Sequence, residues 1–189
     1  MEFESKDKLM EHAQMHMSNK STSSGRLMEY NARKVIGGSI AGAIIGGIVM
    51  AIILLAGASA MGLPAATFFM IIGITLGSGM TSATAIGLAG HFVVAIVAGI
   101  IFGAVVLYAR PLRLTSMGKS LGLGVAAGLV LYLVFFLPLA MTSFAKVMMM
   151  LMGSKASMMM GDVLTVGLIG HLTYGLIIGG VAYYIAKRR

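Results

Sequence analysis

Two histidines stand in matching sequence contexts, and their chemistry is the first that the sequence indicates. His91 ends the segment Gly-Leu-Ala-Gly-His, and His171 ends Gly-Leu-Ile-Gly-His eighty residues later. Both lie in long apolar stretches, where an ionisable residue is a functional candidate because its burial in a membrane is costly. The pair could hold a metal, a water or a proton. Equally, each could be a neutral imidazole that hydrogen-bonds a neighbouring helix, and the sequence leaves both interpretations open.

Methionine is abundant, with eighteen residues, and it is concentrated near one predicted loop. Met148–Met150, Met152 and Met158–Met160 crowd the predicted outer loop between the third and fourth helices. Thioether sulfurs are soft ligands that suit Cu(I). Methionine is also a flexible apolar side chain that fills adaptable interfaces. Copper is therefore a candidate cofactor, and an apolar docking surface is the alternative.

A third group of candidate ligands lies in the polar N-terminal leader. If this segment is helical, His12 and His16 share one face at a spacing of four residues, with Met15 beside them and Met17 following. Such a pair is suited to a soft metal. The alternative is a solvated amphipathic segment that docks on a partner.

Other chemistries are excluded by what the chain lacks. It has no cysteine, which removes disulfides, thiolate metal sites and cysteine catalysis. Asp162 is the only acidic residue after Glu29, so paired-carboxylate catalysis is not expected. The net charge of +8 is carried at predicted helix ends rather than on a basic face, which excludes a nucleic-acid interface. We expect no enzyme activity from this chain by itself.

The elements that must position these residues are membrane helices. Fifty-eight per cent of the residues are hydrophobic and 11% are charged, and the mean hydropathy is +0.95. No charged residue occurs between Val35 and Ala109, which is long enough for two crossings of about 20 residues each. The first apolar run begins too late for a cleavable signal peptide. The sequence predicts an all-α integral membrane protein.

Four transmembrane helices are expected, after a leader over residues 1–32 with a break at Ser21–Gly25. Their predicted ranges are 35–58, 82–108, 117–140 and 162–186, within a membrane domain over 33–189. Two apolar segments, 64–76 and 142–152, are too short to span and are expected to be re-entrant or interfacial. Asp162 is expected to stabilise the N-terminus of the fourth helix through the helix dipole.

Basic residues predict the orientation. Twelve of the fourteen lie in the leader, in the loop between the second and third helices, and at the C-terminus. The positive-inside rule then puts both termini in the cytoplasm of a prokaryote, with the protein in the plasma membrane. A six-span alternative would make both short segments cross, but Lys146 and Lys155 disfavour it.

The second half of the chain repeats the first. The two histidine segments, and the pair Gly99 and Gly179, match at a shift of 80, and Gly47 matches Gly128 at a shift of 81. Repeat 1 covers 35–110 and repeat 2 covers 116–189, each a helix, a short helix and a helix. Two crossings return the chain to its starting side, so the repeats are expected to be related by a pseudo-two-fold axis along the membrane normal.

Small residues recur at four-residue spacing along the predicted helices and are typical of packed helix seams in membranes. The predicted seam positions are Ser39, Ala43, Gly47, Gly87, Gly99, Ser120, Gly124, Gly128, Gly167, Gly175 and Gly179. Both histidines lie on these stripes, and so they are expected to face protein rather than lipid.

In layout the chain resembles the accessory membrane subunits of archaeal copper membrane monooxygenases of the ammonia-monooxygenase type. The shared features are a Gly-, Ile- and Met-rich helical body, no Cys or Trp, a basic C-terminus, and the leader with His12, Met15, His16 and Met17. The resemblance covers the chain, but it is one of composition, and no functional residue is carried across. It implies a place beside a copper-dependent enzyme.

Two function classes follow. The first is a non-catalytic, structural or accessory subunit of a larger membrane complex, whose partners are other membrane subunits and lipid. The alternative is a small channel or transporter for a small solute or metal ion, working as a homo-oligomer. Transporters usually have broken helices or polar groups near the midplane. The predicted first and third helices offer only glycine and apolar residues there, which favours the subunit.

Overall fold

The computed structural model describes the backbone of residues 3–188 and the side chains of residues 32–150 and 152–188. The chain divides into two units, residues 1–34 and residues 35–189. The backbone of the first unit is helical from Phe3 onward and belongs to helix α1 (Phe3–Ala60). The break expected at Ser21–Gly25 is wrong, because the helix runs through it. A single glycine costs a helix only about 1 kcal/mol.

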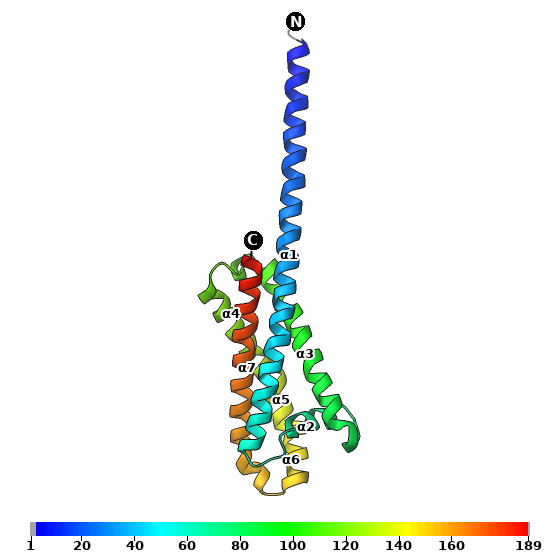
Figure 1. Cartoon of the computed structure of the whole chain (residues 1–189), viewed down its shortest axis with the longest axis vertical. Helices are drawn as coiled ribbons and strands as arrows, with labels where there is room; N and C mark the ends of the chain where they lie inside the picture. Colours follow the sequence, from blue (N-terminus) through cyan, green and yellow to red (C-terminus); the bar gives the residue numbers. More distant parts are fainter. Residues whose placement is uncertain (1–2, 189) are drawn as a thin grey trace. The chain divides into compact units, whose positions relative to one another are not determined.

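The second unit is an all-α membrane domain. Within the described residues, four helices are long and apolar enough to cross a membrane, and there is no strand. They are residues 32–60 of α1, α3 (Met80–Tyr108), a third span over residues 117–150, and α7 (Lys155–Lys187). In this unit the successive spans alternate in direction (Figure 1). The predicted four-span membrane protein is therefore confirmed.

A glycine ends the first span. Gly62 has a φ of +74°, and its N–H donates to the carbonyl of Ser59 while the N–H of Leu63 donates to that of Ala58. This left-handed cap satisfies carbonyls that the helix end would leave without partners. Pro64 follows at once, and it lies before the short helix α2 (Thr67–Thr75) rather than in its first turn. The predicted short segment is confirmed, with a later start.

Helix α2 folds back onto α3. A Cβ atom added at Gly73 would collide with the carbonyl of Ala83, and one at Gly87 with the carbonyl of Phe69. The two backbones are therefore in direct contact. On its other side, α2 reaches the third span, where the rings of Phe68 and Phe144 lie 5.2 Å apart. Helix α2 is thus a wedge between α3 and the third span.

The third span is one continuous helix, and the predicted interruption near residue 141 is wrong. Helix α4 (Met117–Leu131) continues through the π-helical turn η2 (Tyr132–Phe136), α5 (Leu137–Leu139), a second π-helical turn η3 (Ala140–Phe144) and α6 (Ala145–Met152). Pro138 lies between the two wide turns. Such turns let backbone carbonyls find other donors where proline supplies no N–H. The hydroxyl of Thr142 also donates to the Pro138 carbonyl over 2.7 Å. The helix ends only at Gly153, with a φ of +59°.

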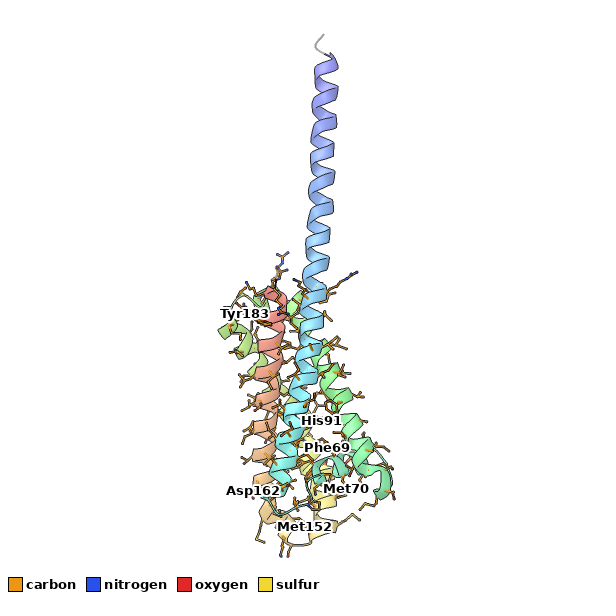
Figure 2. The ribbon with its side chains drawn as sticks, viewed as in Figure 1. Phe69, Met70, His91, Met152, Asp162 and Tyr183 are labelled. Carbon is orange, nitrogen blue, oxygen red and sulfur yellow. The ribbon has the colours of Figure 1, made fainter. Side chains whose placement is uncertain are left out.

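Helix α7 begins seven residues earlier than expected. Its first residue is Lys155, so Asp162 lies in the third turn and cannot serve the helix terminus as predicted. Ala156, which packs in the core, and the methionines that follow it extend the helix outward. Figure 2 shows Asp162 and Met152 toward one end of the membrane domain and Tyr183 toward the other.

Small residues form the contacts between spans. Gly99 of α3 faces Ser39 and Ala43 of α1, and Gly179 of α7 faces Ser120 and Gly124 of α4. On another face of α1, Gly42 and Gly46 meet Ile178 and Tyr174 of α7. All eleven seam positions predicted from the spacing are buried. The packing order is therefore α3, α1, α7, α4.

Candidate functional site

A cavity of about 540 Å³ lies where α3 and the third span do not close on each other. Helix α3 packs on α2 and, in the described part of the chain, has no extended contact with the third span. Met50 and Leu54 of α1 and Phe68 and Ile72 of α2 contribute to the cavity wall. Its polar side chains come from Thr75, His91, His171 and Tyr174. Both histidines singled out by the sequence therefore line one cavity.

His91 connects α3 to α1. Its Nε2–H donates to the carbonyl oxygen of Gly47 over 3.0 Å. The imidazole lies edge-on to the rings of Phe69 and Phe92, with centroids 5.5 and 5.3 Å away. Figure 2 shows His91 close to Phe69 in the middle of the membrane domain.

His171 makes a different hydrogen bond from the same sequence motif. Its Nδ1–H donates to the carbonyl of Gly167, one turn back on its own helix, over 2.7 Å. The ring packs against Tyr132 and Phe136, with centroids 5.8 and 5.3 Å away. Four residues after each histidine, α3 has Ala95 and α7 has Gly175. Because Gly175 has no side chain, the backbone of α7 packs directly on the backbone of α4.

These hydrogen bonds determine which nitrogen atoms stay available. A carbonyl oxygen only accepts, so the bonded nitrogen of each ring carries the hydrogen. In the neutral imidazoles, Nδ1 of His91 and Nε2 of His171 are then acceptors. Among the described side chains, the only buried nitrogen or oxygen atom without a partner is Ser78 Oγ, so neither of these nitrogens is sealed off.

Tyr174 was not among the residues that the sequence indicated. It lies one turn after His171, and its hydroxyl donates to the carbonyl of Ala95 over 2.6 Å. This bond joins α7 to α3 beside the cavity. The available signal was a polar aromatic residue within a stripe of glycines, because a buried tyrosine hydroxyl usually finds a partner.

The remaining metal candidates lie in the leader and in the segment around the α6–α7 connection. The side chains of His12, Met15 and His16 lie outside the described residues. Among the side chains that are described, no group of three or more His, Cys, Asp or Glu could hold a metal ion. The methionines are split, since Met148 is in the core, whereas Met149 and Met150 line a separate shallow hollow with Lys146.

Comparison of the chain with protein-family models, curated proteins and solved structures gives no match. The class of the protein therefore rests on its architecture, which is that of an all-α membrane protein with four transmembrane helices.

Proposed function

We propose that this protein is a non-catalytic subunit of a larger membrane complex. The observation that carries the proposal is a set of exposed apolar side chains on the α6–α7 hairpin, those of Met149, Met150 and Met158. We call it the methionine surface. Their side chains are 51%, 86% and 74% exposed. Methionine adapts its shape to a partner, and it is common at binding surfaces for that reason.

The length of the two helices supports an aqueous location for this surface. The third span covers 34 residues and α7 covers 33. Each is about 50 Å long at 1.5 Å per residue, whereas the hydrocarbon core of a bilayer is about 30 Å thick. The α6–α7 connection extends beyond the start of α3 (Figure 1). Lys146 and Lys155 flank it, which is expected of a segment in water or headgroups.

The charge distribution supports an orientation with both termini in the cytoplasm of a prokaryote and the methionine surface on the outer side of the plasma membrane. Arg110, Arg113 and Lys119 lie at the opposite end of the third span from Lys146. The partner is then another membrane subunit that presents an apolar patch on the outer side of the membrane, or it is a second copy of this chain.

Matching contacts in the two halves support a duplicated unit within this subunit. A Cβ at Gly99 would approach the Ser39 carbonyl, and one at Gly179 would collide with that of Ser120. Both serine hydroxyls donate over 2.8 Å to the carbonyl four residues before. The halves differ in their short segments, because α2 turns away from α1 while α6 continues the third span.

The channel or transporter alternative has less support. A solute path needs polar groups along the membrane normal, whereas the cavity wall consists mainly of Phe, Leu, Val and Met side chains. The resemblance to accessory subunits of copper membrane monooxygenases makes a copper-dependent enzyme the first candidate for the complex. Metal analysis of the natively purified complex tests that part of the proposal.

Substitution of the methionine surface tests the subunit proposal. A photoreactive residue at position 149 should cross-link to one defined neighbouring protein in native membranes. Met150→Gln and Met158→Gln together keep the side-chain length but add polarity, and they should reduce both that cross-link and co-purification several-fold. Met80→Gln is the matched control, since Met80 is 60% exposed but lies on α3. Equal cross-linking in all variants would contradict the proposal.

A further inference from the structure

We infer that the cavity between α3 and the third span binds a lipid-soluble phenol, an apolar molecule whose hydroxyl group donates its one hydrogen to the acceptor nitrogen of His171. The inference concerns a ligand site and does not depend on the proposed complex. It rests on three features of the cavity, which are its opening, its apolar wall and the hydrogen-bonding state of its polar groups.

The cavity opens sideways, toward the hydrocarbon. Val93 and Val94 of α3 line it on one side and Phe135 of the third span on the other. These side chains are 61%, 54% and 60% exposed, so they form a rim rather than a closed wall. At about 540 Å³ the cavity has the size of a small-molecule site. A ligand dissolved in the bilayer can enter without crossing water.

The wall selects an uncharged, apolar body with an aromatic ring. None of the described residues that line the cavity is Asp, Glu, Lys or Arg. A charged headgroup would therefore be buried without a counter-ion, which is costly. The rings of Phe68, Phe136 and Phe144 line the interior, and aromatic rings favour offset or edge-to-face contacts with one another.

The polar groups of the wall select a hydrogen-bond donor. Every side-chain donor in the described wall already donates to a backbone carbonyl: His91 to Gly47, His171 to Gly167, Tyr174 to Ala95 and Thr75 to Ile71. What these side chains still offer is lone pairs, including those of the two imidazole nitrogens. A ketone or an ether would find no side-chain donor here, whereas a hydroxyl finds acceptors.

Matched probes separate this inference from simple partitioning into an apolar cavity. We would measure binding of 4-nonylphenol and of its methyl ether, 4-nonylanisole, to the full chain in lipid nanodiscs by equilibrium dialysis against empty nanodiscs. The two probes share the ring and the tail and differ in the O–H donor. One saturable phenol site per chain is expected, about tenfold tighter than for the ether, as one net hydrogen bond would give.

Variants then locate the site. His171→Phe keeps a ring but removes the acceptor, and it should lower phenol affinity to that of the ether. Val94→Trp should block the rim and abolish the saturable component for the phenol, while Ile52→Trp, at a position 58% exposed on α1 and away from the cavity, should leave it unchanged. Equal affinity for phenol and ether would overturn the inference, as would undiminished phenol binding to Val94→Trp. These two results remain decisive if His171→Phe does not fold.

Discussion

The contacts of each glycine in this chain show which of them are needed for close helix packing. Gly124 and Gly175 are reciprocal, because a Cβ atom on either would collide with the other's carbonyl oxygen. Lipid removes the hydrophobic drive between helices, so close backbone packing must hold α4 and α7 together. Gly122, on the same helix, has nothing within 4 Å of its hypothetical Cβ. The sequence spacing of glycines alone does not tell which of them are in close backbone contact and would be costly to replace.

Gly128→Ala should destabilise the fold by about 1–3 kcal/mol, the usual cost of overpacking, because its methyl group would collide with the backbone carbonyl of His171. Gly122→Ala should change stability by less than about 1 kcal/mol. Unfolding free energies in mixed micelles measure both. Equal effects would show that the contact between α4 and α7 is looser than described.

Gly47 is expected to be more tolerant than Gly128, although the two are matched in the sequence. Its hypothetical Cβ lies 3.3 Å from the Cβ of Ala95 and 3.4 Å from the ring of Phe92. The Phe92 ring can rotate aside, and the Ala95 Cβ needs helix α3 to shift by only a few tenths of an ångström, whereas at Gly128 the added Cβ would collide with a backbone carbonyl. The two seams thus differ in their tolerance of an added side chain, because α3 has Ala95 where α7 has Gly175.

At the scale of the elements, left-handed glycines end three helices at the same side of the membrane domain. Gly62, Gly77 and Gly153 are the described residues with positive φ. At Gly77 the N–H donates to Ile74 and the next N–H, of Ser78, donates to Gly73. The same pair of bonds ends α1 at Gly62. These caps decide where α1 stops and where α2 turns toward α3.

Gly77→Ala should destabilise the turn between α2 and α3 by about 1–2 kcal/mol, since a residue with a Cβ is strained at a φ of +85°. Gly79→Ala is the control, two residues away, because Gly79 has a φ of −69° and open space around it. Faster hydrogen exchange of the α2 amides in the first variant alone is the expected result. Matching exchange in the two variants would argue against the cap.

The third span shows why a sequence pattern can miss helix continuity. Pro138 and the repeat with the first half both predict a break near residue 141. The break does not form, because the two π-helical turns absorb the proline and no glycine occurs between Gly128 and Gly153. Helix α2 exists in the first half because Gly62 and Pro64 stop α1. Residues 129–152 contain no such pair of glycine and proline.

At the scale of the whole molecule, the charge distribution predicts one topology, and cysteine labelling can test it. The chain has no cysteine, so single substitutions report cleanly. Thr115→Cys is preferable to a change at Ser116, whose side chain accepts from the N–H of Lys119 at the start of α4. The residue at 115 should be labelled only from the cytoplasmic side, and Ser154→Cys only from outside. Labelling of both from the same side would refute the four-span topology.

The sequence by itself determined the four spans, and it singled out eleven small residues that are all buried. Both are local properties, since a segment in hydrocarbon must be apolar and must satisfy its own backbone, and small residues four apart must share a helix face. Only the tertiary structure decided that α3 and the third span stay apart on either side of α2. It also decided the cavity they enclose and the different carbonyls that His91 and His171 bond. These features depend on contacts between residues far apart in the chain, which no local spacing encodes.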